Sequence, residues 1–311
     1  MAHAFSLVVL PDAAYGDSAT HIRNSVEYNI TSIYYILPSL IYMIVPAVFP
    51  FTKIMPAIAT ALLLLCSYLL FKYEFKENYI IPFALLTNIP WLIRYGSVNY
   101  LGVFGAAFLM GVIYLKKKRD IDSEIILFIA LCFTKVNATL AGFLTLVPES
   151  IRCNSFYGFL GVFIAGFIFL DMPGSILSLF DFPPVTAFNK FEMLTGVSYL
   201  SVAFLFSLMV LPLAIVTLKG LWQIRQSLYA QAFMFLFAVF AMGGVFWLGY
   251  VDLLYVRWLI PVLPLIPIFY MHGLSKTNGW FRDEVIFSTA LYCIYSFSMT
   301  TISATVYAGI I

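Results

Sequence analysis

Charged residues are scarce in this chain: Lys, Arg, Asp and Glu make up 10% of its 311 residues, whereas hydrophobic residues make up 62%. No stretch is polar enough and long enough to form a separate soluble domain. Cysteine is sparse as well, with four widely spaced residues and no Cys-x-x-Cys or Cys/His spacing, which argues against a zinc site. No basic stripe interleaved with aromatics is present, so the sequence does not point to nucleic acid as a partner.

What remains is a series of apolar runs separated by short polar clusters, a pattern typical of membrane helices. It predicts an all-α, polytopic integral membrane protein with about ten transmembrane helices in one membrane domain, residues 1–311. An amino-terminal external segment, 1–53, precedes a transmembrane bundle, 54–311. The expected spans are 54–71, 79–93, 100–115, 125–134, 137–148, 155–170, 194–217, 228–248, 258–273 and 285–308.

The run 31–50 is ambiguous because Pro38, Pro46 and Pro50 interrupt it. It either crosses the membrane or forms bent juxtamembrane helices on the side of Asp17. If it does not cross, the loops opposite Asp17 hold 11 of the 17 basic residues: Lys72, Lys76, Lys116, Lys117, Lys118, Arg119, Arg152, Lys219, Arg225, Lys276 and Arg282. An excess of Lys and Arg marks the cytoplasmic side. The Asp17 side is therefore predicted to be non-cytoplasmic, in the plasma membrane or the endoplasmic reticulum.

Lys135 interrupts a long apolar run between the expected spans 125–134 and 137–148. Each of these spans is too short to cross a bilayer alone. Either one long helix carries a buried lysine, or two short helices meet at a pocket recessed into the membrane. The second alternative is the one that keeps the loop assignment above.

On the predicted external face, ionisable residues occur singly at the ends of helices. Such groups are costly to dehydrate beside a bilayer, so each is a candidate for a functional site. The candidates are Asp17 and His21 as catalytic residues, Arg94, Lys135 and Arg257 as cations, and Asp181, Lys190 and Glu192 in the external loop 171–193. The cations suit the oxygens of a lipid-linked phosphate, and a carboxylate opposite them suits a general base or a metal ligand.

Structural roles for the same residues stay open. Asp17 could cap a helix amino terminus. Arg94 could anchor its helix at the membrane interface beside Tyr95. Arg257 could form an ion pair with Asp252.

Four short stretches resemble motifs of the GT-C superfamily of polytopic membrane glycosyltransferases, in its protein-mannosyltransferase-like and aminoarabinose-transferase-like branch. Residues 15–23 (Tyr-Gly-Asp-Ser-Ala-Thr-His-Ile-Arg) resemble the acidic motif of the first external loop. Residues 36–49 resemble the juxtamembrane helices that follow it. Residues 131–135 are similar to a Thr-Lys helix junction, and residues 257–264 to an Arg-Tyr-x-x-Pro signature.

The resemblance implies transfer of a sugar from a polyprenyl- or dolichyl-phosphate donor to an acceptor on the non-cytoplasmic face. By it, Asp17 is the catalytic base or a metal ligand, and Lys135 and Arg257 contact the donor phosphate. A divalent metal, Mg²⁺ or Mn²⁺, is possible at Asp17 and Asn99. Asn99 stands where family members usually carry a second acidic residue, and a complete first helix is missing, which suggests a truncated or degenerate relative.

Two other functions compete with an enzyme that uses a lipid-phosphate sugar donor. A non-catalytic GT-C-like membrane subunit would keep the fold to bind membrane lipids or a partner protein, and Asn99 favours it. A small-solute transporter would line its path with the intramembrane charges. Matching half-repeats with broken helices, the usual sequence pointer to a transporter, are not evident.

Overall fold

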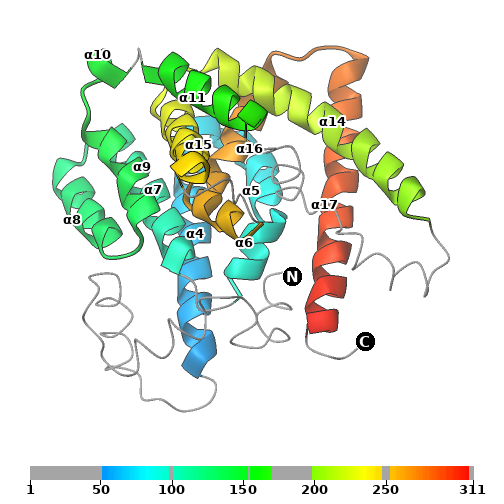
Figure 1. Cartoon of the computed structure of the whole chain (residues 1–311), viewed down its shortest axis with the longest axis horizontal. Helices are drawn as coiled ribbons and strands as arrows, with labels where there is room; N and C mark the ends of the chain where they lie inside the picture. Colours follow the sequence, from blue (N-terminus) through cyan, green and yellow to red (C-terminus); the bar gives the residue numbers. More distant parts are fainter. Residues whose placement is uncertain (1–50, 98–100, 153–154, 170–197, 247–252, 308–311) are drawn as a thin grey trace.

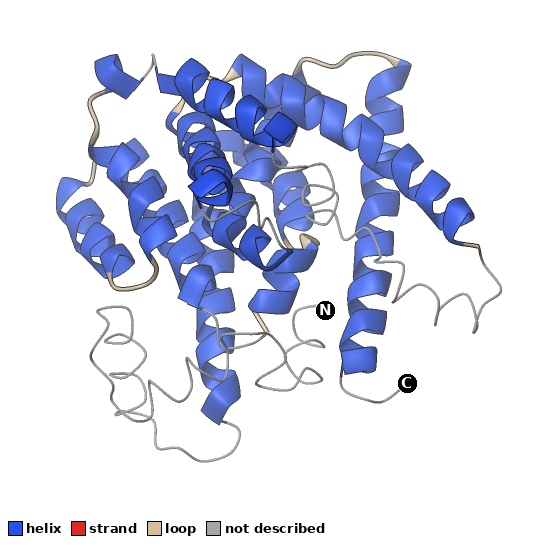
Figure 2. Cartoon of the chain, in the orientation of Figure 1, coloured by secondary structure: helices blue, strands red, loops and turns tan. Residues whose placement is uncertain are grey.

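The computed structural model describes residues 51–97, 101–152, 155–169, 198–246 and 253–307. Every secondary-structure element in these ranges is helical (Figure 2), which confirms the all-α prediction for this part of the chain. The first external segment up to residue 50, including the run 31–50, lies outside the described residues, as does the whole loop 171–193.

The described helices overlap all ten expected spans. In chain order they are α4 (Phe51–Phe75), η2 (Lys76–Tyr79), α5 (Ile80–Leu86), α6 (Pro90–Tyr95), α7 (Leu101–Lys118), α8 (Ile121–Cys132), α9 (Val136–Leu146), α10 (Glu149–Arg152), α11 (Ser155–Phe169), α14 (Tyr199–Gln223), α15 (Leu228–Phe246), η3 (Leu253–Leu265), α16 (Ile266–Ser275) and α17 (Trp280–Tyr307).

Proline divides two of the expected spans. The span 79–93 is not one helix but two, α5 and α6, because Ile89 is extended (ψ 113°) immediately before Pro90 at the start of α6. The span 258–273 begins as the tight 3-10 helix η3, which contains Pro261 and Pro264, and becomes α-helical only in α16. Proline has no N–H for an α-helical bond and disturbs the regular α-helix, which accounts for both departures.

Three segments in the described ranges are long and apolar enough to cross a membrane: Lys53–Leu86, Phe206–Gln223 and Trp258–Ser275. The sequence predicts ten spans, so fewer helices of the described residues meet this length and hydropathy than expected. Helices α8 and α9 contain 12 and 11 residues and are too short to cross singly.

The core is built around α7, which packs against α4, α8, α9 and η3 (Figure 1). Beside it, α14 packs closely on α16. A Cβ atom on Gly220 would lie 1.8 Å from the carbonyl oxygen of Phe269, and one on Gly273 would lie 1.9 Å from that of Val216. Only the absence of side chains at both glycines allows the two helix backbones to approach this closely.

Candidate functional site

Lys135 occupies the turn between α8 and α9, which lie side by side in Figure 1. Its backbone is extended (φ −152°, ψ 140°), and it is the N-cap residue of α9. The structure therefore confirms two short helices meeting at Lys135 rather than one continuous helix. Two bonds hold the turn: Thr134 Oγ1 donates to the carbonyl of Leu131 at 2.7 Å, and the Thr139 amide donates to that of Lys135 at 3.0 Å.

Asn137 ties this turn to the segment that contains Arg257. Its Nδ2 donates to the carbonyl oxygen of Trp258 at 2.5 Å, across 121 residues of sequence. Close packing at Gly105 of α7 supports the junction, because a Cβ there would lie 2.6 Å from Ala138 Cβ. This hydrogen bond joins the backbone near Lys135 to the backbone near Arg257, because Asn137 follows Lys135 by two residues and Trp258 follows Arg257 directly.

Arg94 lies in the last turn of α6, at the end of the bundle where α7 begins. It is half-buried, whereas every other residue of α6 is buried. The helix packs against η3 and α7, and Thr60 Oγ1 of α4 donates to the carbonyl of Gly96 at 2.8 Å. The elements that carry Arg94, Lys135 and Arg257 therefore all pack around the first turns of α7.

Only some of the predicted site residues lie in the described part of the chain. Arg94 and Lys135 are described with their side chains, and Arg257 by its backbone in η3. The other candidates lie outside the described residues: Asp17, His21, Asn99, Asp181, Lys190 and Glu192. Among the described residues, no group of three or more His, Cys, Asp and Glu side chains is arranged to hold a metal ion.

Sequence reasoning did not anticipate the linking role of Asn137. An asparagine in an apolar run is a visible signal, because its amide needs partners once it is buried. In the structure Asn137 is fully buried, with a relative exposure of 0%, and its Oδ1 has no hydrogen-bond partner. The identity of its Nδ2 partner, however, depends on a contact with η3 that no local pattern encodes.

A second polar cluster lies at the opposite end of the bundle, which we call the basic end: residues 72–79, 116–120, 219–229 and 276–282. Glu74 Oε1 accepts a 2.5 Å hydrogen bond from Tyr229 and lies 3.2 Å from Lys117 Nζ. Lys219 Nζ donates to the carbonyl of Lys276 at 2.8 Å. These contacts bring together loops that the sequence analysis had grouped by their Lys and Arg content.

Lys118 lies at this same end and is fully exposed to solvent. A hydrogen bond and electrostatic interaction with Tyr114 raise its pKa above the ordinary lysine value. The ammonium therefore stays charged at neutral pH.

Comparisons of the chain with protein-family models, with curated proteins and with solved structures find no significant match.

Proposed function

We propose that this protein is a GT-C-type membrane glycosyltransferase with about ten membrane crossings. It transfers a sugar from a polyprenyl- or dolichyl-phosphate donor to an acceptor on the non-cytoplasmic face. Arg94, Lys135 and Arg257 bind the donor phosphate, and Asp17, assisted by His21 or a bound divalent metal, removes the proton from the acceptor hydroxyl. Residues 171–193 contact the acceptor through Asp181, Lys190 and Glu192.

The observation that carries the proposal is the junction between α9 and η3. Residues 94, 135 and 257 are far apart in sequence, yet their elements meet around one end of α7. Arginine and lysine residues on elements that meet near a membrane surface suit a ligand with negative charge. A lipid phosphate supplies that negative charge at the depth of the lipid head groups.

The amino terminus of α9 adds to this positive potential. The first N–H groups of a helix carry a partial positive charge, and a cation at the N-cap is electrostatically unfavourable there. Lys135 nevertheless occupies the N-cap of α9 and forms no side-chain capping bond. A phosphate near this turn would interact favourably with the helix terminus and with a lysine side chain, as anions do at other helix amino termini.

Lys135→Met tests the phosphate contact. Removing one charge-assisted contact costs about 1.5–3 kcal/mol, so kcat/KM for a polyprenyl-phosphate-linked sugar is expected to fall roughly 10- to 100-fold. The measurement is transfer of radiolabelled sugar by membranes that contain equal amounts of each variant. Lys276→Met, an exposed lysine at the basic end, is the matched control and should leave the rate unchanged. Equal rates for both variants would remove Lys135 from the site.

The proposed sidedness is tested at Lys118, which is exposed at the end of α7. In sealed membranes with the external face outward, Lys118→Cys is expected to react with a membrane-impermeant maleimide only after the membrane is opened. The unmodified protein gives the background from its four cysteines. Labelling of the intact membranes above this background would invert the orientation and place the candidate site in the cytoplasm.

Asn99 favours a second candidate function, a non-catalytic GT-C-like subunit. An amide can ligate a metal but cannot act as a general base or balance metal charge. Such a subunit would purify with a stoichiometric partner protein and would not turn over the donor. A transporter, the third possibility, would instead show substrate flux into proteoliposomes that depends on Lys135.

A further inference from the structure

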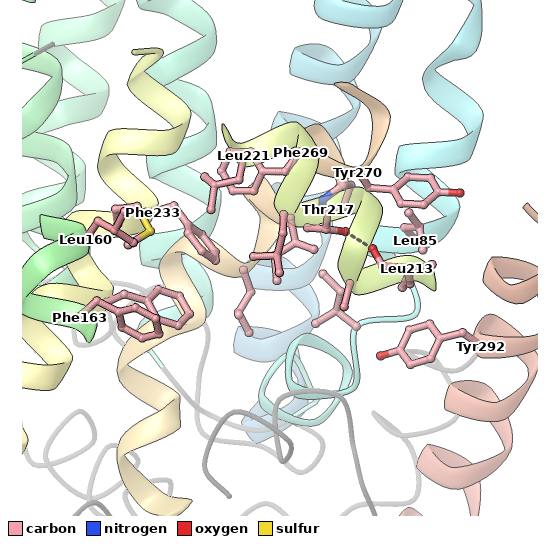
Figure 3. Close-up of a pocket in the computed structure, with 18 residues that line it drawn as sticks. Leu85, Leu160, Phe163, Leu213, Thr217, Leu221, Phe233, Phe269, Tyr270 and Tyr292 are labelled. Carbon is pink, nitrogen blue, oxygen red and sulfur yellow. Dashed lines mark hydrogen bonds between the residues drawn. The ribbon is translucent and has the colours of Figure 1, made fainter. Parts of the chain in front are cut away.

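An apolar cavity of about 370 Å³ lies between α11, α14, α15, α16 and α17, with Leu85 of α5 and Leu263 of η3 also in its lining (Figure 3). Its volume falls within the range of small-molecule pockets. Leu160 and Phe163 of α11 form one wall, Leu213 and Leu221 of α14 another, and Phe233 of α15 a third. None of the lining residues is charged.

The polar groups of the wall are largely engaged within the protein. Thr217 Oγ1 donates to the carbonyl of Leu213 at 2.8 Å, the bond drawn in Figure 3. The Tyr270 hydroxyl is hydrogen-bonded to Thr289 at 2.9 Å. A polar ligand would find few hydrogen-bond partners here, and burying polar groups without partners is costly. The cavity therefore suits a hydrocarbon chain.

The cavity reaches the outer surface of the bundle at α14. Leu218 lines it and is nevertheless 63% exposed. Its neighbours along the same helix, Leu211 and Ile215, are also exposed, at 61% and 47%. This apolar surface is the kind that contacts lipid, so a chain could enter from the side.

A cation and two aromatic rings lie just beyond the cavity, at the basic end. Arg225 lies two residues beyond the end of α14, whose residue Leu221 lines the cavity. Tyr157 precedes Leu160 by three residues on α11, so it lies on the same face of that helix. Arg225 Nε donates to the Tyr157 hydroxyl at 2.9 Å, and its guanidinium lies 5.2 Å from the Trp222 ring centroid. Tyr157 and Trp222 are each about half exposed, as residues at a membrane interface are.

We propose that this is a binding site for an anionic phospholipid of the leaflet at the basic end. One acyl chain occupies the cavity between α11 and α14, and the lipid phosphate lies beside Arg225. Arginine is suited to this role because its planar guanidinium can bond protein groups and phosphate oxygens together. The inference rests on the membrane insertion proposed above but not on glycosyl transfer.

The experiment uses the full chain in nanodiscs of phosphatidylcholine and phosphatidylglycerol in equal parts. Native mass spectrometry counts the lipids of each kind that stay bound after release from the disc. Phosphatidylglycerol is expected to be retained in preference to phosphatidylcholine. Arg225→Gln should reduce that preference about fivefold, the effect of losing one cation at a lipid surface. Ala214→Phe, which places a ring in the cavity, should reduce retention of both lipids.

Three control variants separate this site from general effects. Arg282→Gln removes an exposed cation from the same end, on α17, and should leave the preference unchanged. Tyr157→Phe breaks the hydrogen bond to Arg225 but keeps the cation, so the preference should persist. Leu211→Phe adds a ring to the exposed surface of α14 outside the cavity and should not affect retention.

Equal losses in Arg225→Gln and Arg282→Gln would overturn the proposal, since the preference would then reflect net charge alone. Unchanged retention in Ala214→Phe would also overturn it, because the chain would lie elsewhere. Failure of the chain to incorporate into nanodiscs would instead contradict the proposed membrane insertion. Loss of sugar transfer with normal lipid retention would affect only the proposed enzyme.

Discussion

Asp17→Asn is expected to abolish transfer of labelled sugar from a lipid-phosphate donor while leaving expression unchanged. The substitution keeps the size of the side chain and one acceptor oxygen, but it replaces the other oxygen by an NH2 donor and removes the negative charge and the ability to accept a proton. A positioned general base contributes about 10²- to 10⁴-fold to a rate, so a loss of this size is expected in kcat. The measurement is single-turnover transfer in membranes that contain equal amounts of each protein.

Added metal distinguishes the two roles proposed for Asp17. If the carboxylate is a ligand of Mg²⁺ or Mn²⁺, raising the metal concentration should restore part of the rate, because Asn can still coordinate weakly. If it is the base, added metal should have no effect. Asp283→Asn, an exposed aspartate in the first turn of α17, is the matched control. Retained activity in Asp17→Asn would exclude Asp17 from catalysis.

Gly220→Ala is expected to be among the most destabilising single substitutions in the bundle. The new Cβ would lie 1.8 Å from a backbone oxygen and 2.6 Å from the Gly273 nitrogen, so no side-chain rotation relieves the overlap. Helices α14 and α16 would have to separate along their contact. Overpacking typically costs about 1–3 kcal/mol, and a clash with backbone belongs at or above the upper end of that range.

Gly158→Ala provides the control for this prediction. Gly158 also lies in a helix, α11, but a Cβ there would meet nothing within 4 Å. Alanine is the better helix former by about 1 kcal/mol, so this variant should be neutral or slightly stabilised. Thermal unfolding in one detergent, followed by circular dichroism, compares the two. A midpoint for Gly220→Ala no lower than that for Gly158→Ala would show that α14 and α16 are not packed as closely as described.

Local pattern predicted the positions of the helices more accurately than their continuity. Each of the ten predicted apolar runs overlaps a helix in the described residues, because length and hydropathy are properties of consecutive residues. The break at Lys135 was also visible, since a cation in an apolar run marks either a helix end or a buried site. The 3-10 geometry of η3 was missed, although Pro261 and Pro264 were present to indicate it.

The candidate site was predicted only as a set of residue types on one face. Arg94, Lys135 and Arg257 were chosen because each cation stands at the end of an apolar run. Their elements pack around α7 because of two contacts. Asn137 donates a hydrogen bond to the carbonyl of Trp258, and Gly105 has no side chain, so Ala138 can pack closely against it. Such contacts join residues more than 30 positions apart, and a single sequence contains no periodic signal for them.

The amino-acid sequence by itself determined that this chain is helical, apolar and poor in charge, and it located the cations at the ends of apolar runs. These features follow from composition and from the order of neighbouring residues. Only the tertiary structure decided which helix ends meet, how closely α14 and α16 approach, and where a cavity remains between helices. Those outcomes depend on the shapes of side chains brought together from distant parts of the chain, and packing of that kind is settled only when all the helices are in place.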